Sequence, residues 1–278
     1  MRLEILELTD TKMKFIVSDV TPSFVNSLRR TLIADIPKMA IEDVEFHLGT
    51  IRDDVTNKDY ESVSPLFDEI IAHRLGLLPI PTDLKLFKFR DECGCKGEGC
   101  PNCTIIYTLN KKGPCIVYSD DLEPLGDPSL KIVNPDIPIT KLTEDQALLI
   151  YAWAVLGTGK EHAKWQVASG VGFKCYPSIE IDAKKCDVGG MCVRRCPKKV
   201  LKKEGERIIA ENIEECNLCR TCEDVCELDA IKVEGDDTKY IFHFETDGSM
   251  SAETALKEAL KILENKFNDF ATSLTRMK

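Results

Sequence analysis

The densest chemical signal in the chain is the stretch Cys216-Asn217-Leu218-Cys219-Arg220-Thr221-Cys222-Glu223-Asp224-Val225-Cys226. Its four cysteines have the spacing C-x2-C-x2-C-x3-C, and an incomplete copy lies thirty residues earlier. Superposing the two copies without a gap pairs Cys186 with Cys216, Cys192 with Cys222 and Cys196 with Cys226. Gly189 stands where the earlier copy would have its second cysteine. An ungapped internal repeat of this kind predicts one compact unit, which we place at residues 181–232.

The spacing is typical of bacterial-type ferredoxins, in which three closely spaced thiolates bind one cluster and the fourth cysteine binds the other. The complete set predicts a 4Fe-4S cluster on Cys196, Cys216, Cys219 and Cys222. The second set is Cys186, Cys192 and Cys226, and it is one thiolate short because Gly189 has no side chain. A 3Fe-4S cluster fits the second set best. The alternatives are a 4Fe-4S cluster with water or another outside ligand, or an empty site. Glu227 replaces the proline that usually follows the last cysteine, which counts against the second site.

Seven cysteines in ferredoxin register disfavour structural zinc at these positions, but a second cysteine group elsewhere favours it. The group consists of Cys93, Cys95, Cys100 and Cys103. Four thiolates can close a tetrahedral zinc site, so zinc is expected, with oxidisable free thiols or iron as alternatives. The two remaining cysteines, Cys115 and Cys175, stand alone and are expected to be buried apolar thiols.

The composition limits the classes of function. With 278 residues, the chain is long enough for two or three domains. A net charge of -10 argues against a broad basic face for duplex nucleic acid, so no direct sequence-specific DNA binding is expected. No apolar run is long enough to cross a membrane, and residues 1–17 lack the pattern of a secretory signal. We therefore expect a cytoplasmic protein with clustered thiols as metal ligands.

Four helices are expected from start signals and apolar spacing. The first begins at Thr21-Pro22 and ends before Pro37, and the second begins at Ser64-Pro65 and ends at Gly76. A third is expected from the capping pair Thr143 and Gln146 to Gly157. The Gly157-Thr158-Gly159-Lys160 run that follows lacks the full phosphate-loop spacing, so nucleotide binding is not expected there.

The fourth expected helix follows Ser251 and runs nearly to the C-terminus. Its apolar residues recur at alternating spacings of four and three, as in a coiled-coil seam: Leu256, Leu260, Leu263, Phe267, Phe270 and Leu274. Such a seam can pack on the chain's own core or on a helix of another subunit, and the spacing alone does not decide between them.

Several stretches resemble the RNA polymerase alpha family. They are residues 24–32 (FVNSLRRTL) with 36–41, residues 68–80 (DEIIAHRLGLLPI), residues 159–165 (GKEHAKW) and residues 245–249 (ETDGS). The added ferredoxin insertion is similar to that of the archaeal D-type subunits of this family. The resemblance covers nearly the whole chain.

The resemblance implies an α+β fold with a discontinuous dimerisation domain, an inserted mainly-β domain and an inserted ferredoxin-like iron-sulfur domain. The corresponding ranges are 1–48 and 233–278 with 166–180 for dimerisation, 49–165 for the mainly-β insertion with its cysteine loop, and 181–232 for the iron-sulfur domain. It further implies a non-catalytic subunit of a nucleotidyltransferase.

As partners, the resemblance implies the polymerase subunit L in a heterodimer, the second-largest subunit of the polymerase, and the small subunits N and P. The expected interface residues are Phe24, Leu28, Arg29, Arg30, Leu32, Leu256, Leu260, Leu263, Phe267, Phe270 and Leu274. The rival hypothesis, from the cluster motifs alone, is an electron-transfer subunit of an oxidoreductase, and the missing dinucleotide fingerprint counts against it.

Overall fold

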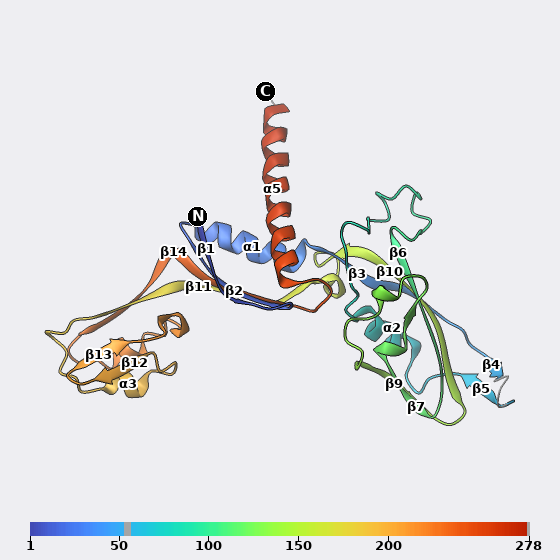
Figure 1. The fold of residues 1–278 in the computed structure, drawn as a ribbon, viewed down its shortest axis with the longest axis horizontal. Coiled ribbons are helices and arrows are strands. Elements are labelled where there is room, and N and C mark those ends of the chain that lie inside the picture. The colour runs from blue at the N-terminus through green and yellow to red at the C-terminus, as the bar shows by residue number, and fades with distance from the viewer. Residues whose placement is uncertain (53–56, 277–278) are drawn as a thin grey trace. The chain divides into compact units, whose positions relative to one another are not determined.

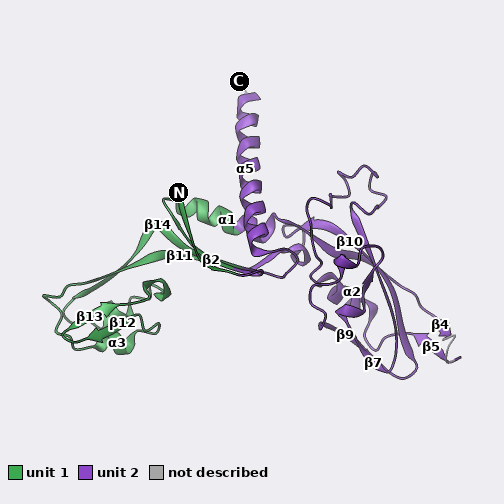
Figure 2. Ribbon diagram, in the orientation of Figure 1, with its two compact units in different colours: residues 1–8, 13–29, 170–244 green, residues 9–12, 30–169, 245–278 purple. Residues whose placement is uncertain are grey.

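The structure is a computed structural model that describes residues 1–52 and 57–276. It is a mixed α+β protein, whose elements are labelled in Figure 1. The chain divides into two compact units (Figure 2): unit 1 comprises 1–8, 13–29 and 170–244, and unit 2 comprises 9–12, 30–169 and 245–278. Each unit is therefore built from segments that are far apart in the sequence.

Unit 1 contains most of a four-stranded sheet with the order β1-β2-β14-β11. Its strands are β1 (Arg2–Leu8), β2 (Lys12–Ser18), β11 (Ala168–Ile181) and β14 (Ile231–Thr246). Aromatic side chains hold neighbouring strands together, and the rings of Phe15 and Phe242 stack with centroids 5.2 Å apart. The long strands β11 and β14 flank the cysteine repeat in the sequence, so they provide the base on which that repeat is built.

Between these strands lie short elements that follow the repeat. They are α3 (Met191–Arg195), β12 (Leu201–Glu204), β13 (Arg207–Ala210), the 3-10 turn η4 (Ile213–Glu215) and α4 (Thr221–Asp224). Cys192 in α3 and Cys222 in α4 are buried among a few aliphatic side chains, including Leu201 and Ile231. The core is small, so the cysteines make up much of its interior.

Helix α1 (Pro22–Ala34) confirms the first expected helix. The Phe24 N–H donates a hydrogen bond to the Thr21 hydroxyl over 3.4 Å, which is the expected N-terminal cap. The buried residues Val25, Leu28 and Leu32 lie at helical spacing along one face.

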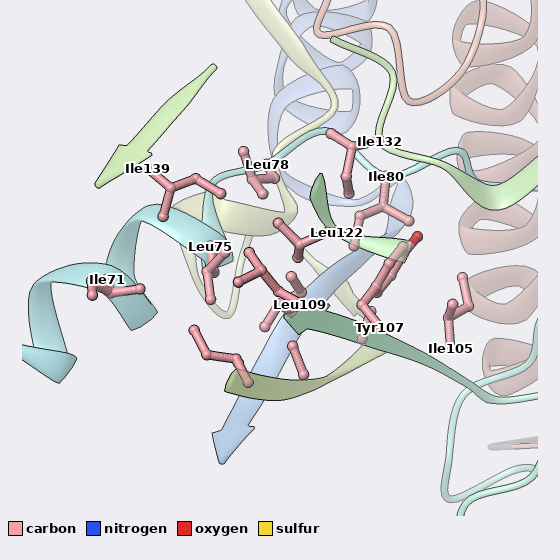
Figure 3. Packing of buried hydrophobic residues seen from close by; sticks show 14 of the residues in the cluster. Ile71, Leu75, Leu78, Ile80, Ile105, Tyr107, Leu109, Leu122, Ile132 and Ile139 are labelled. Carbon is pink, nitrogen blue, oxygen red and sulfur yellow. The ribbon is translucent and has the colours of Figure 1, made fainter. Parts of the chain in front are cut away.

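Unit 2 is built around a sheet of order β4-β5-β10-β6-β8, with β3 also paired to β10. The strands are β3 (Pro37–Phe46), β4 (Thr50–Arg52), β5 (Asp59–Ser62), β6 (Thr104–Lys112), β8 (Glu123–Pro124) and β10 (Gln146–Thr158), and β7 (Cys115–Tyr118) pairs separately with β9 (Pro138–Leu142). The buried core of this unit, seen in Figure 3, packs Ile71 and Leu75 near the fully buried Tyr107 and Leu109. The Tyr107 hydroxyl donates to the Leu130 carbonyl over 2.6 Å, so its polar atom is satisfied inside the core.

The expected third helix is wrong, because its residues form strand β10. The Thr143 N–H does donate to the Gln146 side chain over 2.9 Å, but this contact closes a turn ahead of a strand. β10 pairs antiparallel with β3 along one edge and with β6 along the other. Buried and half-exposed residues alternate from Leu148 to Ala154 with the period of two that a strand requires. Pairing on both edges outweighs a cap signal of about 1 kcal/mol.

The second helix exists but begins later than expected, as α2 (Asp68–Gly76). The Ser64 hydroxyl accepts the Leu66 N–H over 3.3 Å in a turn before the helix. The apolar residues around α2 are not all buried. Ile71 and Leu75 are buried, whereas Phe67, just before the helix, is 78% exposed.

Helix α5 (Ala252–Arg276) confirms the expected C-terminal helix, and the Ser251 hydroxyl accepts the Thr254 N–H at its start. Leu256 and Leu263 of the seam are buried in the chain's own structure. The rest of the seam, namely Leu260, Phe267, Phe270 and Leu274, is exposed. Neither α5 nor any other helix among the described residues combines the length and apolar character needed to span a membrane.

Candidate metal centres

The loop between α2 and β6 brings four thiols together. The Sγ atoms of Cys93, Cys95, Cys100 and Cys103 all lie within 4.8 Å of one another. Individual separations are 3.5 Å for Cys93–Cys100, 3.5 Å for Cys95–Cys103 and 3.9 Å for Cys100–Cys103. Sulfur ligands about 2.3 Å from a tetrahedral zinc ion stand roughly 3.8 Å apart. The described geometry therefore fits a single metal ion.

The electrostatics of this loop also favour a cation. The Gly99 N–H lowers the pKa of Cys95 to about 6. A hydrogen bond from the Cys95 N–H lowers the pKa of Cys93. Hydrogen bonds with the thiols of Cys100 and Cys95 raise it more, and the result is a pKa of about 11. Four adjacent thiols cannot all lose their protons without a positive charge among them, and a bound metal supplies that charge. A metal can thus bind here, and the thiol set suits zinc.

The ferredoxin-type cysteines are spaced more widely. Among the described residues, Cys93 to Cys103 is the only group with three or more ligand atoms all within 4.8 Å. An iron-sulfur cluster is larger than one ion, so its thiolates stand further apart than those of a zinc site. The cluster ligands Cys186 to Cys226 therefore stay a prediction.

The two copies of the repeat share an unusual backbone. Positive φ angles occur at equivalent positions thirty residues apart: Val188 (57°) and Leu218 (58°), Gly190 (74°) and Arg220 (59°), Lys199 (54°) and Asp229 (47°). Such angles cost a residue with a side chain on the order of 1 kcal/mol or more, and they persist where the surroundings impose them. Two loops that adopt the same strained shape are suited to wrap the same kind of group.

A cavity of about 210 Å³ lies at the second, incomplete set. Its lining includes Cys186, Cys192 and Cys226, together with Gly189. The three cysteines predicted to share a cluster therefore border one space, and so does Gly189, the position that lacks a thiol.

Burial makes two of these thiols, Cys192 and Cys222, poor thiolates without a cation. It raises the pKa of Cys222 to about 11 and also raises that of Cys192. Cys219 is exposed, and hydrogen bonds from the Thr221 hydroxyl and N–H lower its pKa. Iron bound at these sites would compensate the buried thiolate charge.

Three side chains from the sheet hold the loop before Cys216, and sequence reasoning missed them. The Lys174 ammonium donates to the Cys216 carbonyl over 2.7 Å and to the Glu214 carbonyl over 2.5 Å. Tyr176 donates to the Glu214 carboxylate over 3.1 Å, and Lys14 pairs with Glu215 over 2.9 Å. These partners lie 38 to 201 residues apart in the sequence, so no local spacing could have indicated them.

The expected interface residues differ in burial. Leu28, Leu32, Leu256 and Leu263 are buried, whereas Arg30, Leu260, Phe267, Phe270 and Leu274 are exposed, with Phe24 and Arg29 half-buried. The Arg29 guanidinium donates to the Asn26 side chain over 3.0 and 3.2 Å. The exposed members on α5 form an apolar stripe that no other part of residues 1–52 and 57–276 covers.

Comparison with known proteins gives consistent matches. Residues 51–184 match the family described as RNA polymerase Rpb3/RpoA insert domain. The chain is 47% identical over 273 residues to the DNA-directed RNA polymerase subunit Rpo3 of Picrophilus torridus, covering 98% of this chain and 99% of that protein. Identity is 47% over 275 residues to the subunit Rpo3 of Thermoplasma volcanium, covering 99% and 100% of the two chains. It is 37% over 280 residues to that of Methanosarcina acetivorans, covering 100% and 99%.

Proposed function

Because the chain belongs to the family of DNA-directed RNA polymerase subunit Rpo3, we propose that it is the assembly subunit that pairs with subunit L. The heterodimer is the platform on which the large subunits assemble, and catalysis belongs to those subunits. The ranges 1–48 and 233–278 with 166–180 form the dimerisation domain, 49–165 the mainly-β insertion and 181–232 the iron-sulfur domain. The family relationship does not favour the rival function in an oxidoreductase.

The observation that carries the pairing is the exposed half of the α5 seam. Phe267 and Phe270 are each 64% exposed and Leu274 is 50% exposed, although they continue the spacing of the buried Leu256 and Leu263. Burying one such side chain gains roughly 1.5–3 kcal/mol. A regular apolar stripe without a partner in its own chain is typical of a binding surface. The heptad spacing suits a helix of the partner.

The other contacts rest on the family resemblance and on exposure. Arg30 is exposed, and Arg29 is held against Asn26 beside it on α1. We assign this pair to the contact with the second-largest subunit of the polymerase, with the small subunits N and P bound nearby. Guanidinium groups suit such a surface because they pair with carboxylates in a planar, bidentate geometry.

The iron-sulfur domain is assigned a structural role. Its aliphatic core is small; Cys192, Cys216 and Cys222 are buried in it, and Cys186, Cys196 and Cys226 pack against it. Cluster binding is then coupled to folding of the domain, as metal binding generally is in small domains. A 4Fe-4S cluster on Cys196, Cys216, Cys219 and Cys222 stabilises it, with a second cluster on Cys186, Cys192 and Cys226.

Co-expression with subunit L tests the function. Tagged wild-type chain should retain subunit L at a stoichiometric level. The double substitution Phe267→Ser with Phe270→Ser should lower that recovery by tenfold or more, because it removes two buried anchors from the interface. Asn268→Ala, on the same helix turn and exposed, is the matched control and should keep full recovery. Recovery of a flavoprotein or hydrogenase partner in place of subunit L would contradict the assembly function.

A further inference from the structure

The cavity at the incomplete cysteine set is lined by acidic residues as well as cysteines. Beside Cys186, Cys192 and Cys226, its lining includes Asp187 and Glu227. Three thiolates leave one iron of a four-iron cluster without a protein sulfur. A carboxylate in the same space can bind that iron, because oxygen donors are common ligands of divalent iron.

Asp187 is the carboxylate beside the missing thiol. A Cβ atom built on Gly189 would meet three nearest atoms, and all of them belong to Asp187: Oδ1 at 3.2 Å, Oδ2 at 3.3 Å and Cγ at 3.5 Å. The side chain of Asp187 therefore lies next to the space where a cysteine side chain at position 189 would begin. Glu227 lines the cavity but is not among these nearest atoms.

The orientation of Asp187 is fixed by the same loop. Its Oδ1 accepts a hydrogen bond of 2.9 Å from the Gly189 N–H. Within residues 1–52 and 57–276, no other hydrogen bond or ion pair engages this carboxylate, so Oδ2 is open to a metal. The Asp187 side chain is therefore already oriented before iron binds, so binding loses less side-chain conformational entropy.

We propose that Asp187 supplies the fourth ligand at the second site, so that this site holds a 4Fe-4S cluster on three thiolates and one carboxylate. The inference rests on the proposed iron-sulfur domain and replaces the 3Fe-4S cluster expected from the cysteines alone. Uptake of the last iron balances without a further electron: a 3Fe-4S cluster reduced to the neutral state takes up Fe²⁺ and becomes a 4Fe-4S cluster of charge 2+.

The exposure of Asp187 makes this iron exchangeable. Both Asp187 and Gly189 are exposed, whereas Cys192 is buried. One corner of the second cluster then faces solvent through a ligand weaker than a thiolate. The second site converts between four-iron and three-iron forms according to the supply of Fe²⁺, while the complete site does not.

The test is an iron titration of the full-length chain, reconstituted without oxygen and reduced with dithionite. Electron paramagnetic resonance follows the 3Fe-4S signal after reoxidation, and iron and sulfide are counted per chain. Asp187→Asn keeps an oxygen that can accept the Gly189 N–H but loses the anionic ligand. It should retain the 3Fe-4S signal and need about tenfold or more Fe²⁺ to convert it. Glu227→Gln should titrate like the wild type.

Gly189→Cys in the Asp187→Asn background supplies a fourth thiolate and should restore the four-iron form. Asp187→Asn alone can lose the signals of both clusters. If adding Gly189→Cys then restores both signals, the proposal stands. If adding Gly189→Cys does not restore them, the proposal is overturned. Identical titration of wild type and Asp187→Asn, or a shift in Glu227→Gln instead, also overturns it while leaving the iron-sulfur domain intact. A wild-type chain with iron for the complete site alone contradicts the second site itself, and a chain without iron contradicts the proposed domain.

Discussion

At the scale of the residue, the glycines of the Gly157-Thr158-Gly159-Lys160 run are explained by packing. A Cβ on Gly157 would lie 2.3 Å from the Trp165 ring, and one on Gly159 would lie 2.3 Å from the Ile33 carbonyl oxygen. The Trp165 ring cannot easily move, because its N–H donates to the Val155 carbonyl over 3.1 Å. Glycine at these positions allows a close approach of the chain to the Trp165 ring and to the Ile33 carbonyl.

Gly157→Ala should therefore destabilise the protein by about 1–3 kcal/mol through overpacking. Gly76→Ala is the matched control, since its new Cβ would meet neighbours at the ordinary distances of 3.5 and 3.7 Å at the end of α2. It should be neutral or slightly stabilising. Thermal unfolding of the two variants measures the contrast. An unchanged midpoint in Gly157→Ala would show that the ring yields to the methyl group.

Substitution of Cys219 tests the proposed structural role of the complete cluster. Cys219→Ser replaces an expected thiolate ligand, so it should remove the visible absorbance of the complete cluster and make residues 181–232 sensitive to protease. Cys115→Ser is the control, because Cys115 lies outside both cysteine groups and donates to the Lys112 carbonyl, a bond that a hydroxyl can keep. If Cys219→Ser left the folding of this domain and polymerase assembly unchanged, the structural role would be wrong.

At the scale of the element, the sequence predicted α1 and α5 well and β10 poorly, for a physical reason. The two helices carry their own caps at Thr21 and Ser251 and a one-sided apolar stripe, so local signals suffice. β10 lies between β3 and β6 and carries apolar residues on both of its faces, including the half-exposed Leu149 and Trp153. A buried strand of this kind cannot be distinguished from a helix by periodicity, and its register depends on partners distant in the sequence.

The cysteine sites show the same division. Spacing predicted which thiols cluster in the loop of Cys93 to Cys103, and the structure brings those four together. It also predicted the repeat, whose loops have matching backbone angles. The anchors Lys174 and Tyr176 on β11 were not predictable, because a lysine or tyrosine on a strand has no sequence feature that identifies a hydrogen-bond acceptor about forty residues away.

Residues in the first part of α5 should contribute to the stability of the free chain, and residues in its last part should contribute to binding of subunit L. Leu263 is 8% exposed and Phe267 is 64% exposed, although both belong to the seam. Leu263→Ala should lower the free energy of unfolding of the free chain by about 2–5 kcal/mol through the cavity it leaves. Phe267→Ala should change it by less than about 0.5 kcal/mol and weaken binding of subunit L. Urea unfolding of the free chain and pull-down of subunit L measure the two effects. Equal destabilisation by both substitutions would mean that the outer seam packs within this chain.

Lys174 connects the sheet of unit 1 to the loop of the complete cluster. Lys174→Met keeps the length of the side chain but removes donors to the Glu214 and Cys216 carbonyls. Loss of these charge-assisted hydrogen bonds should destabilise the loop by about 1–3 kcal/mol. Iron should then leave faster under a chelator, followed by the decay of the cluster absorbance. Lys198→Met, a change of the same kind at an exposed lysine near the loop, should leave the decay rate unchanged.

At the scale of the whole molecule, the two kinds of metal site lie in different compact units. The loop of Cys93 to Cys103 belongs to unit 2, and the ferredoxin-type repeat belongs to unit 1. Each set of ligands is complete within its own unit. We therefore expect each proposed metal to stabilise its own unit, because neither site takes a ligand from the other unit.

Selective removal of each metal should follow this division. A zinc chelator that releases zinc from the loop of Cys93 to Cys103 should lower the thermal stability of unit 2 while the cluster absorbance of unit 1 is unchanged, because the loop ligands all lie outside residues 170–244. Exposure to oxygen should bleach the clusters and leave the zinc content unchanged, since iron-sulfur clusters are oxidised and zinc has no redox chemistry. Zinc analysis, visible absorbance and protease mapping of the two units follow both treatments. Loss of both metals under either treatment would show that the units fold as one cooperative body.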